Sequence, residues 1–216
     1  MKASEEGMDL AIDLSGDRHL SEAEIEEEQR ERLWQAHPEH PWNRSTASKY
    51  GAVTVVSLTA LVSTLSSSMP IPGLTRMGSD FGVTNGQVLT LSISLYILAV
   101  GVGPFIFSPL SEVYGRRPIY LVTVSLFLIM NLLCGFVSNY PGMLVLRFLA
   151  GAFGSAGPGG IGVSSVADLF PKEGRGKPLG LYSISPMAGP PLGALLGAYL
   201  DAKLEWRWVY HVLAML

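Results

Sequence analysis

The segment 109–118 places an acid, a glycine and two arginines between two long apolar stretches. Gly115 permits a tight turn, because glycine tolerates a positive φ. Arg116 and Arg117 can bind anionic lipid headgroups or the carbonyl groups at neighbouring helix ends, and Glu112 can pair with either arginine. This segment is a candidate charge network, and a plain basic hairpin between two helices is the alternative interpretation.

Arg147 is a second candidate, because it lies within the apolar segment Leu-Val-Leu-Arg-Phe-Leu-Ala-Gly at 144–151. A charged side chain inside a membrane span is costly, so it is a functional candidate by default. It follows the turn signal Pro141-Gly142 by roughly five residues, on the order of 8 Å at 1.5 Å per residue. At that depth a long side chain can also extend to the membrane surface, so a structural role stays open.

Small residues and prolines recur between positions 185 and 197, where the sequence reads Ser-Pro-Met-Ala-Gly-Pro-Pro-Leu-Gly-Ala-Leu-Leu-Gly. Gly189, Gly193 and Gly197 are four residues apart, share one helix face and permit close approach of another backbone. Pro190 and Pro191 lack an N–H group, and we expect them to kink the helix. Tight packing without a switching role is the alternative explanation of this pattern.

Other kinds of chemistry are not indicated by the sequence. No glycine-rich loop is followed by Lys-Ser or Lys-Thr, as a phosphate-binding loop would be. Cys134 is the single cysteine and lies in an apolar run, which is typical of a small buried side chain. The four histidines lack metal-ligand spacing: His19, His37, His40 and His211. We therefore expect no enzyme, no metal, no cofactor and no nucleic-acid partner.

The elements around these candidates are apolar and nearly free of charge. The chain is 48% hydrophobic and 15% charged, whereas soluble domains carry about 25% charged residues. Residues 1–50 hold 12 of the 18 acidic and 6 of the 15 basic residues, so the remainder is depleted of charge. A membrane helix needs about 20 mostly apolar residues. Polar hinges place such spans at about 51–71, 88–108, 118–138, 143–166 and 179–200, with the start of a sixth at 206–216.

These spans are not expected of a soluble protein, because they lack the polar stripe of an amphipathic helix. We predict an all-α integral membrane bundle over residues 47–216, with five complete spans and the beginning of a sixth. Residues 1–46 are acidic and poor in apolar side chains, which predicts a disordered tail. A short helix over 21–35 capped by Ser21, or a partner-binding segment, is the alternative.

Lysine and arginine residues in the short loops predict the orientation of the bundle. With the N-terminus in the cytoplasm, seven of them lie on the inner side and three on the outer side. The inner set is Arg44, Lys49, Arg116, Arg117, Lys172, Arg175 and Lys177, and the outer set is Arg76, Lys203 and Arg207. This distribution predicts a multi-pass membrane protein with a cytoplasmic N-terminus. It also predicts that the glycosylation sequon at Asn43 stays unmodified.

Together these motifs resemble the major facilitator superfamily, in particular its fungal drug:proton antiporters. That family carries the signature Gly-x-Leu-Ala-Asp-Arg-x-Gly-Arg-Lys between its second and third helices. The matching residues are Leu110, Glu112, Gly115, Arg116 and Arg117, whereas Pro109 replaces the first glycine. The resemblance implies a charge network that gates the inward-closed state, with Asp168 at the inner end of the fourth span as a partner.

The resemblance extends to the fourth and fifth spans. The family has an arginine followed four residues later by a glycine in its fourth helix, associated with proton coupling or substrate handling, and Arg147 and Gly151 match it. Its antiporters carry Gly-x-x-x-Gly-Pro-x-x-Gly-Gly in the fifth helix. This chain has Gly189, Pro190 and Gly193 there, with Ser185 and Ala194 in place of two glycines. The similarity covers about 41–216 and favours an exporter.

By resemblance, the whole protein is expected to be a secondary active transporter of the plasma membrane. It would export drugs or other small organic molecules in exchange for protons, by alternating access. The family has twelve helices, so this chain is expected to be the N-terminal half, with the lipid bilayer, a substrate, protons and a second six-helix half as partners. No acid lies in the middle of a span, so Glu112, Asp168 or the second half would carry the proton. A short non-transporting protein that associates with full-length carriers, and an uptake symporter, are the alternatives.

Overall fold

The computed structural model describes residues 26–27, 29–30, 33, 37, 41–43, 45–157, 160–171 and 174–216. Most of the tail predicted to be disordered over 1–46 lies outside these residues, and the described part of it includes the helical segment Pro41–Asn43. Thr46–Leu216 forms one compact unit, and every regular element described is helical. The elements are the 3-10 helix η1 (Pro41–Asn43) and the α-helices α3 (Thr46–Ser68), α4 (Leu74–Phe81), α5 (Gly86–Tyr114), α6 (Arg116–Phe136), α7 (Tyr140–Gly154), α8 (Gly160–Leu169), α9 (Gly176–Lys203) and α10 (Trp206–Met215).

Among the residues that the structure describes, three helices are long and apolar enough, by length and composition, to cross a membrane: α3, α5 and α6. Only 39%, 28% and 28% of their respective apolar windows are buried within the chain, so much of their apolar surface faces outward. Exposed apolar surface of this kind is unfavourable in water and favourable in the hydrocarbon core of a membrane. Helix α9 has 28 residues but is not among the three, because its glycines, prolines and serines lower its hydropathy.

The fourth apolar stretch differs from the single span expected at 143–166. It consists of two shorter helices, α7 and α8, with a turn at 155–157 after α7. The sequence here contains glycines and a proline, which favour a helix end over continuation. Backbone groups released by a break inside a span need partners within the protein. The Tyr182 hydroxyl of α9 supplies one, because it donates to the Gly157 carbonyl at 2.6 Å.

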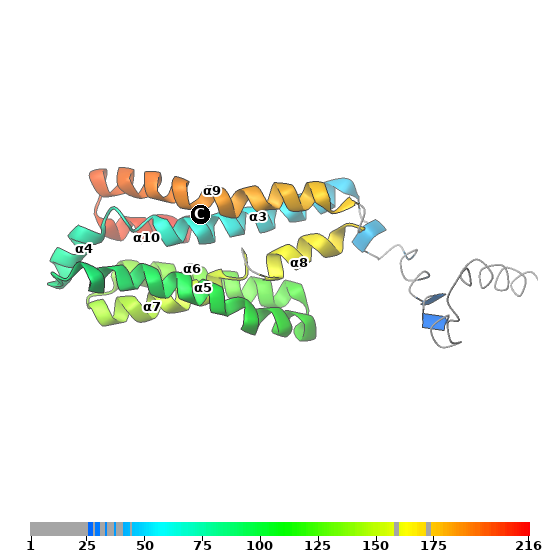
Figure 1. Ribbon diagram of the computed structural model, residues 1–216, viewed down its shortest axis with the longest axis horizontal. Helices are drawn as coiled ribbons and strands as arrows, with labels where there is room; N and C mark the ends of the chain where they lie inside the picture. Colours follow the sequence, from blue (N-terminus) through cyan, green and yellow to red (C-terminus); the bar gives the residue numbers. More distant parts are fainter. Residues whose placement is uncertain are drawn as a thin grey trace, which may run out of the picture. The chain divides into compact units, whose positions relative to one another are not determined.

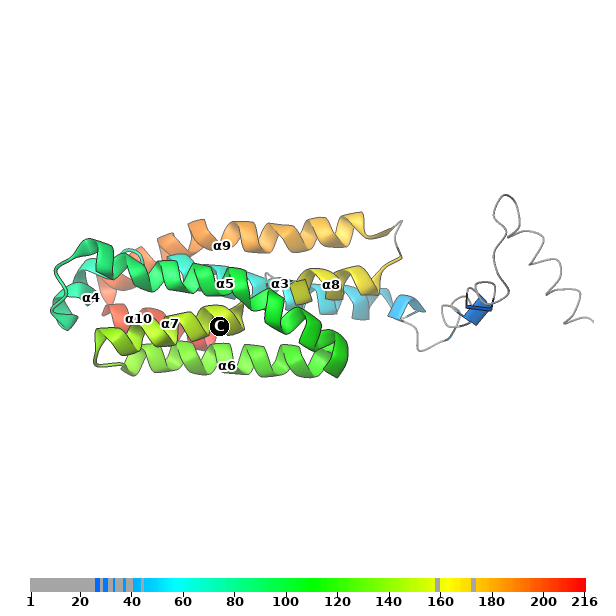
Figure 2. The same ribbon diagram turned by 60° about the horizontal axis from the view of Figure 1, so that its bottom comes forward.

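The helices of the compact unit lie side by side in two groups (Figure 1). Helix α9 packs along α3, while α7 packs against both α5 and α6, and α10 packs mainly on α6. The turn between α5 and α6 and the short helix α4 lie at opposite ends of the bundle (Figure 2). We call these the Gly115 end and the α4 end.

Glycines set how closely α9 approaches α3. A Cβ atom added at Gly189 or Gly193 would overlap atoms of α3, and one added at Gly197 would overlap Met69, the residue directly after α3. All three expected glycines therefore face this segment of the chain. The contact also includes a hydrogen bond, in which the Ser68 hydroxyl donates to the Pro190 carbonyl at 2.8 Å. Helix α9 continues without interruption through its three interior prolines, Pro186, Pro190 and Pro191. The pair is therefore held by backbone proximity rather than by large interlocking side chains.

Candidate functional site: a buried arginine between two charged ends

Arg147 lies in the interior of the bundle with 2% of its surface exposed. Its Nη1 atom donates to the backbone carbonyl of Ser66 at 3.1 Å and to the Ser66 hydroxyl at 3.3 Å. The side chain thus turns from α7 toward α3, and it does not extend to a membrane surface. Burying a guanidinium, which stays charged at any physiological pH, is costly unless the surroundings compensate.

Two tyrosine rings cover the buried guanidinium. Its Cζ atom lies 4.5 Å from the centroid of the Tyr210 ring and 5.3 Å from that of Tyr96. Both rings are 1% exposed, and such cation–π contacts strengthen when water is excluded. Among the described residues no carboxylate lies within ion-pairing distance of Arg147, and its Nη2 atom makes no hydrogen bond. Aromatic faces and one serine therefore take the place of a counter-ion.

The serine that receives Arg147 is itself held by an amide. The Ser66 hydroxyl donates to Oδ1 of Asn131 at 3.1 Å, and Nδ2 of Asn131 donates to the Phe127 carbonyl at 2.8 Å. Ser66 and Asn131 are fully buried. Because Ser66 gives its proton to Asn131, its oxygen lone pairs are free to accept from the arginine. Helices α3, α6 and α7 are thereby joined by one polar chain.

Gly151 explains how Tyr96 reaches the arginine. It lies one turn after Arg147 on the same face of α7, since residues four apart are neighbours on a helix surface. A Cβ atom at Gly151 would overlap the backbone carbonyl of Tyr96 on α5. The glycine therefore lets α5 and α7 approach at the point where the Tyr96 ring meets the guanidinium.

At the Gly115 end, one ion pair joins two parts of the bundle that are far apart in sequence. Nη2 of Arg116, at the start of α6, lies 2.7 Å from Oδ2 of Asp168, near the end of α8. The two side chains expose 32% and 51% of their surface. Gly115 itself has a φ of 89°, a region that side chains disfavour, so the turn needs a glycine at this position.

The other two charges of the loop are not part of this contact. Glu112 and Arg117 are exposed, and within the described part of the chain neither makes an ion pair. Of the expected network Glu112, Arg116, Arg117 and Asp168, the structure brings together Arg116 and Asp168. The expected pairing of Glu112 with the neighbouring arginines is absent from the described contacts.

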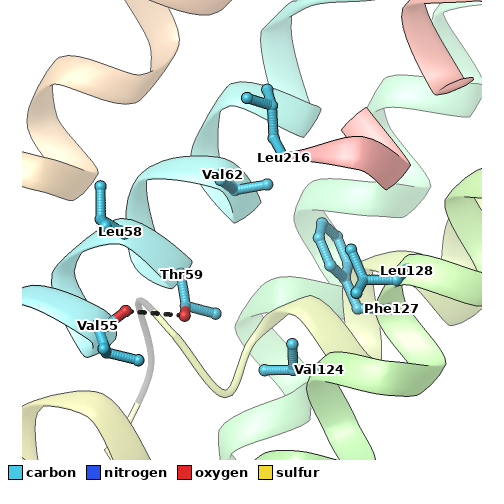
Figure 3. A pocket seen from close by; sticks show the side chains of 8 residues that line it. All are labelled: Val55, Leu58, Thr59, Val62, Val124, Phe127, Leu128 and Leu216. Carbon is cyan, nitrogen blue, oxygen red and sulfur yellow. Dashed lines mark hydrogen bonds between the residues drawn. The ribbon is translucent and has the colours of Figure 1, made fainter. Parts of the chain in front are cut away.

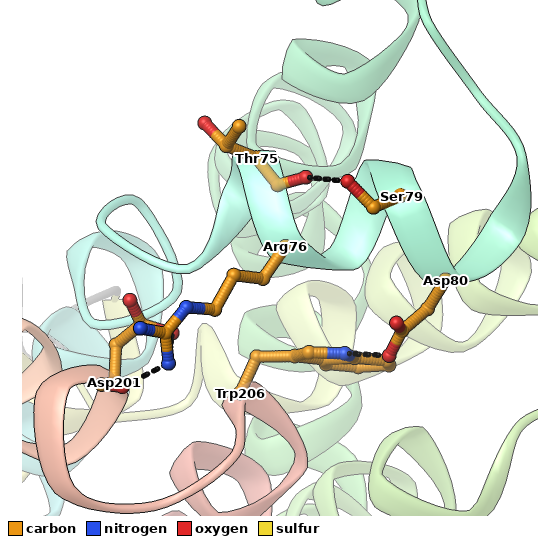
Figure 4. Close-up of polar contacts among 6 residues, drawn as sticks. All are labelled: Thr75, Arg76, Ser79, Asp80, Asp201 and Trp206. Carbon is orange, nitrogen blue, oxygen red and sulfur yellow. Dashed lines mark hydrogen bonds and ion pairs between the residues drawn. The ribbon is translucent and has the colours of Figure 1, made fainter.

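At the α4 end, a second polar cluster ties α4 to the junction of α9 and α10. Figure 4 shows Arg76 reaching from α4 to Asp201, while Asp80 lies beside the indole nitrogen of Trp206. Arg76 Nη1 is 3.6 Å from Asp201 Oδ1 and also donates to the Asp201 carbonyl. Trp206 Nε1 donates to Asp80 Oδ2 at 2.7 Å. Arg207 lies over the Trp206 ring at 4.8 Å, which adds a second cation to the cluster.

A cavity of about 190 Å³ lies between α3 and α6 (Figure 3). Its lining is apolar apart from Thr59, whose hydroxyl donates to the Val55 carbonyl of its own helix. The lining is mainly apolar, so the cavity favours apolar groups. The lining residues are Val55, Leu58, Thr59, Val62, Val124, Phe127, Leu128 and Leu216.

Comparison with known proteins assigns this bundle to a family. The family described as Major Facilitator Superfamily matches residues 56–216, which include the buried arginine and both charged ends. The chain belongs to the Major Facilitator Superfamily. The all-α membrane fold and the family resemblance expected from the sequence are thereby confirmed, and the family consists of transporters rather than enzymes.

Curated major facilitator proteins of fungi are similar to the chain over most of its length. Efflux pump radE of Floropilus chiversii is 38% identical over 82% of this chain and 33% of its own length. The trichosetin biosynthesis cluster MFS transporter of Gibberella fujikuroi is 37% identical, covering 83% and 37%. An uncharacterized transporter of Schizosaccharomyces pombe is 33% identical, covering 94% and 42%. The chain thus spans about a third to two-fifths of the length of these relatives.

Several residues of this major facilitator site were not predicted from the sequence. Arg147 was identified by its charge. The sequence indicates no more for Tyr96, Asn131 and the Ser and Thr side chains of the first span, Ser66 among them, than that they could line a path, with simple packing as the favoured alternative. Tyr210 carried no signal, because a tyrosine in an apolar span gains its role from a distant helix. The cluster at the α4 end was also missed, since α4 has only eight residues in an expected loop. No group of three His, Cys, Asp or Glu side chains suited to a metal occurs among the residues described.

Proposed function

We propose that the complete protein is a secondary active transporter that exports drugs or other small organic molecules in exchange for protons. The observation that supports this most is Arg147, a permanent charge held in the apolar interior without a carboxylate partner. A buried, incompletely compensated charge weakens a fold, so its presence argues for a working role. The similarity to a protein named as an efflux pump favours export.

The ion pair between Arg116 and Asp168 suits a reversible latch in alternating access. It joins the turn between α5 and α6 to α8, so it can hold two parts of the bundle together in one state. Because both side chains are partly exposed, the pair contributes only about 0–1 kcal/mol and is easily broken. We propose that the Gly115 end and the N-terminus face the cytoplasm, in the plasma membrane. Glycan on Asn43 would contradict this orientation.

Arg147 cannot carry the transported proton, because arginine does not lose its charge in proteins. We propose that it controls a carboxylate instead. An acid that approaches a cation is favoured in its ionised form, and an acid that leaves the cation for an apolar environment is favoured in its protonated form. The acid is Asp168, Glu112 or a residue of the second half. We propose that the conformational change that moves the acid toward or away from Arg147 also moves the substrate across the membrane.

Efflux from living cells tests this proposal. The complete product of the gene is expressed in yeast lacking endogenous drug pumps, and the 216-residue chain is expressed in parallel. Export of a panel of cationic, neutral and anionic fluorescent dyes is followed with and without a proton uncoupler. We expect the complete product to export at least one dye class and to stop when the uncoupler is added. Efflux that persists after uncoupling contradicts proton exchange, and dye accumulation driven by the gradient identifies an uptake symporter.

A further inference from the structure

We infer that Tyr96 and Tyr210 are positioning residues that hold the Arg147 guanidinium in place of a counter-ion. This inference rests on the proposed function for its role in transport, but its geometry stands separately. The guanidinium lies between the two rings, at 4.5 Å and 5.3 Å from their centroids. The rings come from α10 and α5, and the cation from α7, so three helices meet at one charge.

The two tyrosines are held in different ways. The Tyr96 hydroxyl donates to the Ser63 carbonyl at 2.7 Å, and the Ser63 hydroxyl donates to the Gly154 carbonyl at 2.8 Å. The Tyr210 hydroxyl is buried, and within the described residues it has no hydrogen-bond partner. Tyr96 is thus fixed by its polar end, whereas Tyr210 contributes only the face of its ring.

The Tyr210 ring is fixed by neighbouring aromatic contacts instead. It meets Trp206 edge to face, with centroids 6.0 Å apart and planes at 86°. Trp206 in turn is held by Asp80 through the hydrogen bond at 2.7 Å. The position of α10 therefore determines where the nearer ring lies over Arg147. If the rings stand in for a counter-ion, the ring face of Tyr210 should matter more than its hydroxyl.

A nuclear magnetic resonance measurement on the 216-residue chain tests this placement. The chain is labelled with nitrogen-15 arginine in detergent micelles, and the Arg147 signal is identified by its loss in Arg147→Lys. A guanidinium facing aromatic rings has its proton resonances shifted upfield by the ring currents. We expect this shift to persist in Tyr210→Phe and to become smaller in Tyr210→Leu, which keeps only the more distant Tyr96 ring. Tyr199→Leu is the control, because Tyr199 is 65% exposed on α9.

An unchanged Arg147 signal in a folded Tyr210→Leu protein would overturn the inference. If that variant does not fold, phenylalanine with two or three fluorine atoms at position 210 replaces it. Fluorine withdraws electrons from the ring face while preserving the ring, so cation–π attraction weakens stepwise. We expect the melting temperature to fall with each fluorine at position 210 and to stay constant with the same series at position 199. Equal behaviour at the two positions would also overturn the inference.

Transport by the complete gene product shows whether Tyr210 positions the Arg147 guanidinium for transport or only packs against it. Tyr199→Leu should keep the wild-type efflux rate and pH profile, because Tyr199 is 65% exposed on α9. Tyr210→Leu should lower efflux about tenfold, equivalent to ~1.4 kcal/mol, and move its pH profile. An unchanged pH profile in Tyr210→Leu would contradict a role in positioning the charge. If the resonance shifts behave as expected but no proton-dependent efflux exists, the proposed function fails and the placement of Arg147 stands.

Discussion

At the scale of single residues, the buried charge of Arg147 is the feature that the rest of the site accommodates. Ser66 receives it, two tyrosine rings cover it, and Gly151 brings one of those rings close. A charged residue in an apolar span can be recognised from sequence alone. Its partners cannot, because they lie on other spans, 81 residues away for Ser66, and their residue types are common.

Arg147→Met separates a functional role from a structural one. Replacing a buried, incompletely paired charge by an apolar side chain of similar length is often neutral or stabilising by about 1–4 kcal/mol. We therefore expect the 216-residue chain carrying Arg147→Met to melt in detergent at the same or a higher temperature. A loss of stability of several kcal/mol would show that the arginine holds the bundle together.

The ion pair at the Gly115 end is predicted to matter for transport more than for stability. Arg116→Asp or Asp168→Arg should each abolish efflux by the complete gene product while changing the free energy of unfolding by only about 0–1 kcal/mol. The double variant, which restores the pair in reverse, should regain efflux. Arg117→Asp is the matched control, because Arg117 makes no ion pair among the described residues. A double variant as inactive as the single ones would contradict the latch.

At the scale of elements, the spans themselves are predictable, and their interruptions are not. Apolar runs between polar hinges predict where α3, α5, α6 and α9 lie, because a helix must cover the hydrocarbon core. The break after α7 is not visible in a pattern of uncharged runs, although the glycines and the proline around it favour a helix end. It is stabilised by Tyr182 of another helix, a tertiary contact that sequence spacing does not reveal.

The close packing of α9 predicts that glycine-to-alanine substitutions at two positions of this helix differ in their effect on stability. Gly197→Ala should destabilise the bundle by about 1–3 kcal/mol, because the added Cβ atom would overlap the Met69 carbonyl. Gly180→Ala, where nothing lies within 4 Å of the added atom, should be neutral or stabilising by up to about 1 kcal/mol. Thermal unfolding in detergent compares the two. Equal destabilisation by both would contradict a close α3–α9 contact.

The break in the fourth span depends on one hydroxyl group. Tyr182→Phe leaves the Gly157 carbonyl without this donor, and an unsatisfied buried acceptor costs about 1–3 kcal/mol. Hydrogen exchange should accelerate in residues 150–157 of this variant. Tyr199→Phe on the same helix provides the reference, since Tyr199 is largely exposed. Unchanged exchange in Tyr182→Phe would show that the turn is supported by other contacts.

At the scale of the whole molecule, the family and the all-α membrane fold follow from the sequence, because charge depletion and motif order are global properties. The direction of transport and the proton carrier do not follow. They depend on how Arg147 and the Arg116–Asp168 pair meet the rest of the protein during a change of state. In the proposed function, this chain is one bundle of a transporter in which the fixed charge of Arg147 controls a mobile proton.

The most direct test is a transport measurement with the complete gene product in sealed lipid vesicles. A proton gradient is imposed in the absence of any other energy source, and movement of the dye identified by the cell assay is recorded together with proton flux. We predict that the dye moves against its concentration gradient, that protons move in the opposite direction, and that Arg147→Met abolishes both while remaining folded. Coupled movement of dye and protons that survives in Arg147→Met would contradict the central role of the buried arginine.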